Sequence, residues 1–192
     1  MTDITPFAID VASSDIDDLK ARLALTRFPD RETPEDWSQG IPLAYMQEIK
    51  AYWQNQYDWP ARQALLNRWD GFKTDLDGLS IHFLHIRSSH ADAKPLLLTH
   101  GWPGSIVEFQ KVIGPLTEPT EHGGDSADAF HLVVPSLPGF GFSGKPTAPG
   151  WGIDKIAQAW AQPPPPPPPP PPPHPNNNNN NHNTNSQYYA AD

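Results

Sequence analysis

A turn with the sequence His-Gly-Trp-Pro-Gly-Ser, at residues 100–105, has residue types suited to presenting a backbone N–H group to a ligand. It follows the run Leu-Leu-Leu-Thr at 96–99, which Pro95 precedes, and this pattern predicts a buried parallel strand. Open α/β sheets place ligand chemistry at the carboxyl ends of such strands. A peptide N–H fixed there would stabilise a developing negative charge, so the turn is a candidate oxyanion-binding element.

The candidate group within this turn is the backbone N–H of Trp102, and three neighbours would shape its position. Gly101 lets the chain approach a ligand closely, and Pro103 fixes the φ angle that follows. His100 is expected to form local hydrogen bonds that shape the turn, not to transfer protons. An ordinary tight turn is the alternative, and the strand–turn–helix context leads us to favour the functional interpretation.

A second loop, with glycines at 139, 141 and 144, matches the pattern G-x-G-x-x-G. A dinucleotide-binding turn must open a helix at once, so that the pyrophosphate meets the helix N-terminus. Here Pro138 precedes the pattern, Lys145-Pro146 follow it, and the next predicted helix starts only after Gly150. We therefore favour a loop shaped by neighbouring backbone over a nucleotide site.

Two serines near these loops do not fit the nucleophile elbow G-x-S-x-G. Ser143 has Lys145 in place of the second glycine, and Ser105 lacks the pattern on both sides. Ser105 is better explained as a helix cap, because Glu108 completes a capping box with it. The sequence therefore predicts neither a nucleophile nor a catalytic base.

The eight histidines predict no metal site, and no cofactor is predicted either. His82 and His85 are three positions apart on a predicted strand, so their side chains point to opposite faces. His174 and His182 lie in a low-complexity tail, where any ion binding would be weak and nonspecific.

Short helices are predicted over the first 71 residues. Ser14 is expected to cap one that ends at Phe28-Pro29; another begins at Pro42 and a third near Trp59. Large aromatic residues crowd this region: Trp37, Tyr45, Tyr52, Trp53, Tyr57, Trp59 and Trp69. A ligand cage is one interpretation, but we favour packing of short helices onto a neighbouring domain.

Strand patterns begin after residue 71. Asp77-Gly78 separates the segments 72–76 and 79–86 and predicts a hairpin, because both turn positions need positive φ. A helix from Ser105 through Leu116, a buried strand at 130–134 and a helix at 152–160 follow. The last helix is expected to point three side chains inward: Ile153, Ile156 and Trp160. A hairpin followed by alternating strands and helices predicts an α/β fold.

Composition narrows the class of protein. A net charge of −9 argues against a nucleic-acid partner or an anionic membrane surface, which need clustered Lys and Arg. The chain has no cysteine, which fits a cytoplasmic protein, and no run that approaches the ~18 apolar residues of a membrane span. Eleven prolines from Pro163 and six asparagines from Asn176 form a tail that cannot contribute to a core.

Several separate motifs, in the same order, resemble those of the microsomal-type epoxide hydrolases. Those of the N-terminal region are Pro6-Phe7-x-Ile9, Leu23-x-x-Thr26-Arg27-Phe28-Pro29, Tyr52-Trp53-x-x-x-Tyr57-Asp58-Trp59, Leu66-Asn67 and Leu76-Asp77-Gly78-Leu79-x-Ile81-His82-Phe83. The later ones are the turn at 100–105 and the segment at 135–143. The resemblance implies a helical N-terminal region at 1–71, an incomplete α/β-hydrolase domain at 72–162 and a disordered tail at 163–192.

The resemblance also implies a cofactor-free reaction on a small-molecule epoxide. In the family an Asp carboxylate opens the epoxide to a covalent ester, while two lid tyrosines donate hydrogen bonds to the epoxide oxygen. A His paired with an acidic residue then activates water to cleave the ester, and the oxyanion hole stabilises the tetrahedral intermediate. Of these groups only Trp102 has a counterpart here, as one backbone donor in the turn shaped by His100, Gly101 and Pro103.

The family's nucleophilic Asp stands in a Gly-x-Asp-x-Gly elbow after a strand that should start just beyond Trp160, where the proline run begins instead. We therefore expect a truncated epoxide hydrolase, from a damaged or misread gene, that is inactive as written. The alternative is a non-catalytic protein without a membrane anchor, whose polyproline tract binds a profilin-like or other aromatic-grooved partner. The DNA downstream of the Trp160 codon would separate the two.

Overall fold

A mixed β-sheet organises residues 3–161, the part of the chain that the computed structural model describes. Its strands are β1 (Thr5–Pro6), β2 (Gly71–Leu76), β3 (Leu79–Ile86), β4 (Lys94–Leu97) and β5 (Phe130–Pro135). They are ordered β1-β2-β3-β5-β4, and neighbours are antiparallel except β4 and β5, which are parallel. The predicted tail, with its proline run, His174 and His182, lies outside the described residues.

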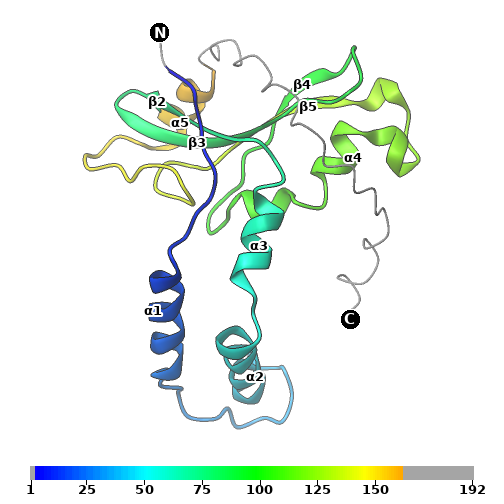
Figure 1. The fold of residues 1–192 in the computed structure, drawn as a ribbon. Coiled ribbons are helices and arrows are strands. Elements are labelled where there is room, and N and C mark those ends of the chain that lie inside the picture. Colours follow the sequence, from blue (N-terminus) through cyan, green and yellow to red (C-terminus); the bar gives the residue numbers. More distant parts are fainter. Residues whose placement is uncertain (1–2, 162–192) are drawn as a thin grey trace.

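The helices divide into an N-terminal group and a group that alternates with the strands. The α-helices are α1 (Ser13–Ala24), α2 (Leu43–Asn55), α3 (Trp59–Leu66), α4 (Ile113–Thr117) and α5 (Ile153–Trp160). Short 3₁₀ turns are η1 (Ile106–Phe109), η2 (Pro119–His122) and η3 (Ser126–Asp128). Figure 1 shows α1 and α2 extending away from the sheet, with α3 leading back to it. No helix within residues 3–161 is long and apolar enough to cross a membrane.

The predicted hairpin is confirmed. β2 and β3 pair through six residues each, from Gly71 opposite Leu84 to Leu76 opposite Leu79. Asp77 and Gly78 both have positive φ, 52° and 80°, as a two-residue hairpin turn of this kind requires. β1 adds to the free side of β2, so the N-terminal segment joins the same sheet. The predicted division of the chain between residues 71 and 72 stays a prediction.

The starts of the N-terminal helices differ in part from the expectation. Ser14 is not the cap of α1: the cap position is Ala12, two residues earlier, which offers no side-chain acceptor, and the helix starts at Ser13. Pro42 occupies the cap position of α2, just before the first helical residue. α3 has a side-chain cap, because a carboxylate oxygen of Asp58 accepts a hydrogen bond from the Ala61 N–H at 3.0 Å.

Replacing Asp58 with alanine should destabilise the folded chain by about 1 kcal/mol, the usual cost of losing a helix N-cap. Thermal unfolding of the 192-residue protein measures this as a lower Tm. Asp58→Asn is the matched control, because asparagine caps helices as well as aspartate does and should keep the Tm near wild type. Equal Tm values for all three proteins would contradict the assigned cap.

The strand before the candidate turn is shifted and more exposed than predicted. It comprises Lys94–Leu97 instead of 96–99, and it lies at an edge of the sheet, paired only with β5 among the described residues. Leu97 is 44% exposed, so the strand is not buried on both faces. Pro95 lies inside it, which an edge strand tolerates because one side of its backbone needs no ladder partner.

The core lies where β3 and β5 pack against the segment that follows the candidate turn. Its buried residues are Leu84, Ile86, Ile106, Ile113, Leu132 and Val134. The helix expected from Ser105 to Leu116 is broken into η1 and α4, yet both pieces contribute to this core through Ile106 and Ile113. The single helix predicted from Ser105 to Leu116 is therefore wrong in its continuity, although the same segment does supply two buried apolar residues.

The last described helix, α5, differs from the prediction at its first residue. Ile153 is 87% exposed, not inward, while Ala159 is buried and both Ile156 and Trp160 are half-buried. Only the last turn of α5 is buried among the described residues. Ile153, in the first turn, therefore lies outside the packed part of the helix.

Candidate functional site

His100 holds the turn that follows β4. Its side chain is almost fully buried, and its Nε2 accepts a hydrogen bond from the Leu137 N–H at 3.1 Å. Its Nδ1 lies 3.0 Å from the Gly101 carbonyl oxygen, which only accepts, so Nδ1 carries the proton and donates. The imidazole and the Phe140 ring form a T-shaped pair with 5.6 Å between centroids. Both nitrogens of a neutral imidazole are thus used in fixing the turn to the loop after β5.

Trp102 lies at the outside of this turn, with its side chain 83% exposed. Within residues 3–161 its backbone N–H has no hydrogen-bond acceptor. Gly104 makes the turn compact, because a Cβ at that position would lie 2.7 Å from the Gly101 carbonyl oxygen. The chain then enters η1 through the predicted capping box, in which the Ser105 N–H donates to Glu108 at 3.0 Å and Val107 N–H donates to Ser105 Oγ at 3.3 Å.

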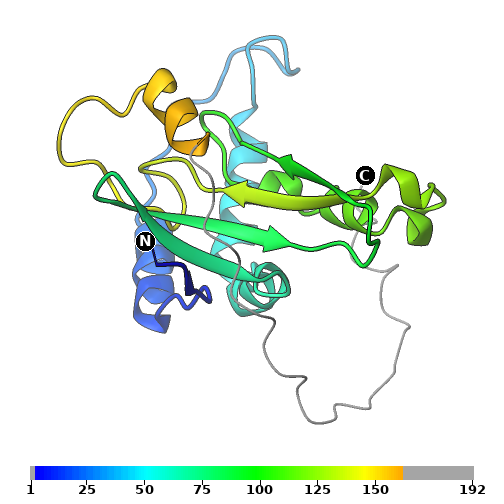
Figure 2. The same cartoon turned by 90° about the horizontal axis from the view of Figure 1, so that it is seen from above.

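The position of the turn suits a backbone donor to an anion. Figure 2 shows the loops after β4 and β5 leaving the sheet at the same end. This is the end at which α/β sheets bind ligands. A free N–H held by a buried histidine contact would be preorganised, and such a donor stabilises negative charge that develops on a reacting oxygen.

The glycine-rich loop after β5 is shaped by the backbone of β3. Gly139 and Gly141 have positive φ, 83° and 51°, and the Gly144 N–H donates to the Ser80 carbonyl oxygen at 2.6 Å. A Cβ on Gly144 would lie 3.0 Å from Leu79. No helix begins until α5, so the loop lacks the helix N-terminus that a dinucleotide site requires.

The serine in this loop is structural. Ser143 Oγ is buried, donates to the Ser136 carbonyl oxygen at 2.7 Å and accepts from the His82 N–H at 2.9 Å. A Ser–His pair with the spacing of a nucleophile and its base does exist, Ser136 Oγ and His82 Nδ1 at 2.9 Å. Both residues are 0% exposed, so substrate has no access to this pair.

His82 and His85 point to opposite faces of β3, as predicted. His82 contacts the rings of Phe7 and Phe142, whereas His85 contacts Phe72, which pairs with Phe83 on the other face. Within residues 3–161 no group of three or more His, Asp or Glu side chains is arranged to hold a metal ion.

Four of the aromatic residues of the N-terminal region help to line an apolar groove of about 450 Å³ between α1, α2 and the start of α3. Its lining consists of Ile16, Leu19, Lys20, Ile49, Tyr52, Trp53, Tyr57 and Trp59. Tyr52 and Trp53 are 44% and 45% exposed, so their packing is only partial among the described residues.

Sequence patterns identified the turn but not the partners that hold it. Leu137, whose N–H binds His100, and Phe140, whose ring packs on His100, follow a strand about 37 residues later than the turn. The available signal was topological: parallel neighbouring strands end at the same edge, so their following loops meet.

The matching family profile and the two relatives that follow all belong to the epoxide hydrolases. Residues 4–109 match the profile of the family "Epoxide hydrolase N terminus". A putative epoxide hydrolase of Stigmatella aurantiaca is 60% identical over 159 residues, covering 83% of this chain and 36% of that protein. Epoxide hydrolase 1 of Sus scrofa is 38% identical over 144 residues, covering 73% of this chain and 32% of that protein.

A solved structure confirms the predicted fold class. The crystal structure of juvenile hormone epoxide hydrolase from the silkworm Bombyx mori aligns with a TM-score of 0.73 and 33% identity, over 83% of this chain and 42% of that one. The chain spans about a third of the length of the two relatives above. It has the α/β-hydrolase fold class, with helices ahead of the sheet, and it belongs to the epoxide hydrolase family.

Proposed function

We propose that residues 3–161 form the N-terminal region and one half of the oxyanion hole of an epoxide hydrolase. The observation that carries the proposal concerns the Trp102 N–H. It has no hydrogen-bond acceptor among the described residues, and the turn that contains it is attached to Leu137 by the His100 hydrogen bond. Gly101 and Pro103 flank Trp102 in the turn. In α/β-hydrolases a backbone N–H from the turn after a sheet strand supplies one donor, and the residue after the nucleophile supplies the other.

The proposed role belongs to the second chemical step. Opening of the epoxide by a carboxylate forms an ester and places negative charge on the epoxide oxygen. In the family, the lid tyrosines would donate hydrogen bonds to that oxygen. Hydrolysis of that ester passes through a tetrahedral intermediate whose charge lies on the former carboxylate oxygen. The Trp102 N–H is proposed to donate to that oxygen, so it acts on ester hydrolysis and not on ring opening.

The nucleophile, base, acid and lid are proposed to lie in the other two-thirds of a family member's length. No cofactor is proposed. The 192-residue chain alone is accordingly proposed to be inactive on a small-molecule epoxide, without a nucleic-acid partner and with a cytoplasmic location. Binding of an aromatic-grooved partner by the proline run stays a hypothesis from sequence, because that run lies outside the described residues.

Joining residues 1–161 of this chain to the remaining C-terminal part of the Stigmatella aurantiaca relative should restore turnover of a styrene-oxide-type substrate. The relative is 60% identical over the replaced region, so the interface between the two parts should be retained. Diol formation is the measurement. The 192-residue chain and the relative's C-terminal part, each assayed alone, are the controls and should give only background diol.

A folded chimera without turnover would contradict the proposed function. Turnover by the purified 192-residue chain would contradict the assignment of the nucleophile to the part of a family member that this chain does not span. Circular dichroism and a cooperative thermal transition establish that the chimera is folded before either result is interpreted.

A further inference from the structure

His82 connects β3 to the loop after β5 through hydrogen bonds from both backbone and side chain. Its carbonyl oxygen accepts from the Ser136 N–H at 2.9 Å, and its N–H donates to Ser143 Oγ at 2.9 Å. Its Nδ1 lies 2.9 Å from Ser136 Oγ. The imidazole therefore adds a side-chain bond to a residue that the backbone of β3 already holds.

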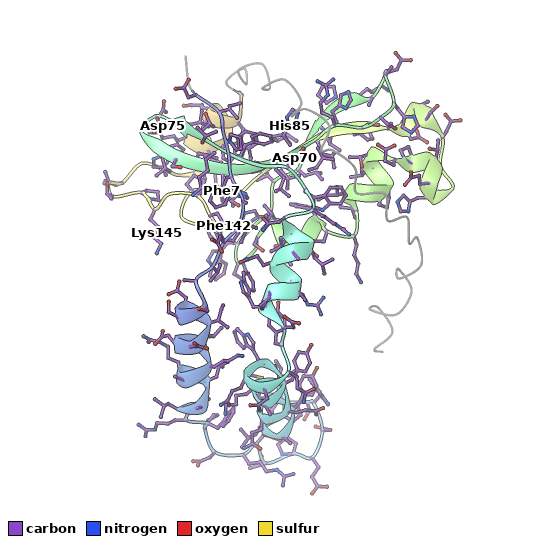
Figure 3. All side chains as sticks on the ribbon, in the orientation of Figure 1. Phe7, Asp70, Asp75, His85, Phe142 and Lys145 are labelled. Atoms are coloured by element: carbon purple, nitrogen blue, oxygen red, sulfur yellow. The ribbon has the colours of Figure 1, made fainter. Side chains whose placement is uncertain are left out.

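The imidazole of His82 packs against two aromatic rings, which also contact each other. Phe7 and Phe142 pack edge-on against it at 5.2 and 5.4 Å between centroids, and Figure 3 shows these two labelled side chains close together. Burial, with a smaller contribution from the charge of Lys73, lowers the pKa of His82 to about 4. A neutral ring in this position serves as a hydrogen-bonding group and has no route to exchange protons with substrate.

The residue next to Ser136 is the one that binds the candidate turn. Leu137 donates its N–H to His100 Nε2, and His100 in turn donates to the Gly101 carbonyl oxygen. The loop has little regular structure of its own: it contains two glycines with positive φ, at 139 and 141. Its first residues therefore depend on outside contacts for a fixed position.

We propose that His82 is a positioning residue for the oxyanion turn: by holding Ser136 it fixes Leu137, and through His100 it fixes the backbone that presents the Trp102 N–H. The path runs from His82 on β3 to the Gly101 carbonyl in the turn after β4, through hydrogen bonds and the peptide link between Ser136 and Leu137. The inference rests on the proposed function for the meaning of the Trp102 N–H, but the coupling itself is a property of this chain.

Gly141 supports the specificity of this arrangement. A Cβ at position 141 would lie 3.0 Å from Ser136 Oγ, so the loop closes tightly over the Ser136 hydroxyl that His82 binds. If His82 served only to fill the core, the loop would not need to pack so closely against the Ser136 hydroxyl. Removal of the hydroxyl should then loosen the first residues of the loop more than it weakens the fold as a whole.

The test is amide hydrogen exchange at Leu137, with the ¹⁵N shifts of the His100 ring, in the 192-residue protein. Ser136→Ala and His82→Leu should each speed Leu137 exchange at least tenfold beyond the change expected from global stability and should shift the His100 nitrogens. His82→Asn, whose amide replaces the Nδ1 position, should retain most of the wild-type protection.

His131→Leu is the matched control. His131 lies near the start of β5, at the opposite end of that strand from Leu137, and its Nδ1 accepts a hydrogen bond from the Ser88 N–H at 3.0 Å. It should lower global stability without a specific effect at Leu137 or His100. Equal effects from His131→Leu, or unchanged Leu137 exchange in Ser136→Ala, would overturn the proposal. Because the measurement needs no turnover, it separates failure of the coupling from failure of the proposed activity.

Discussion

Replacing Trp102 with proline in the active chimera should lower kcat by about 10²–10³-fold, the usual loss when one oxyanion-hole donor is removed. Proline has no backbone N–H, so the substitution removes the proposed donor itself. The neighbours that fix the turn, His100 and Gly101, are unchanged. Steady-state rates of diol formation measure the loss.

Trp102→Ala is the matched control for that prediction. It keeps the backbone N–H and removes a side chain that is 83% exposed, so its kcat should stay far closer to the starting protein. Thermal unfolding of both variants checks that the fold is retained. If alanine and proline lowered kcat equally, the indole side chain and not the N–H would be the active group, and the assignment would be wrong.

The folded chain should lose about 3 kcal/mol of stability as the pH falls from 6.5 towards 4 because of His82 alone. Folding lowers the pKa of this residue from its ordinary value of 6.5 to about 4, and each unit of difference corresponds to about 1.36 kcal/mol. In that window the unfolded chain binds a proton that the folded chain does not. The stabilisation is therefore complete above pH 6.5 and is lost on acidification.

Denaturant unfolding at a series of pH values measures this effect. Carboxylates also titrate at the acid end, so the informative quantity is the difference between wild type and His82→Asn, which has no ionisable group at that position. The wild-type profile should fall more steeply between pH 6.5 and 4. Parallel profiles for the two proteins would show that His82 titrates equally in the folded and unfolded states.

Local patterns predicted those parts of the fold that local physics determines. The Asp77-Gly78 hairpin and the Ser105–Glu108 capping box depend on a few adjacent residues, and both are present as expected. The errors have tertiary causes. The helix after Ser105 breaks because its apolar residues pack on the sheet in two short pieces, and Leu97 is exposed because β4 lies at an edge.

The candidate site was predictable as a turn but not as a network. A strand followed by His-Gly-Trp-Pro indicates a backbone donor at Trp102, and the family resemblance predicts that this donor belongs to an oxyanion hole. The contacts of His100 with Leu137 and of His82 with Ser136 join segments 37 and 54 residues apart. Their partners are a backbone amide and a serine hydroxyl, which no spacing pattern distinguishes from other loop residues.

The most direct test of the account is to detect the covalent ester by intact-protein mass spectrometry after mixing the Trp102→Pro chimera with epoxide. If the Trp102 N–H stabilises the tetrahedral intermediate of ester hydrolysis, ring opening proceeds at its normal rate and the protein accumulates with one substrate mass added. The Trp102→Ala chimera should show no such accumulation. A folded Trp102→Pro chimera that fails to form the adduct, or that hydrolyses it as fast as the starting protein, would contradict the role assigned to this turn.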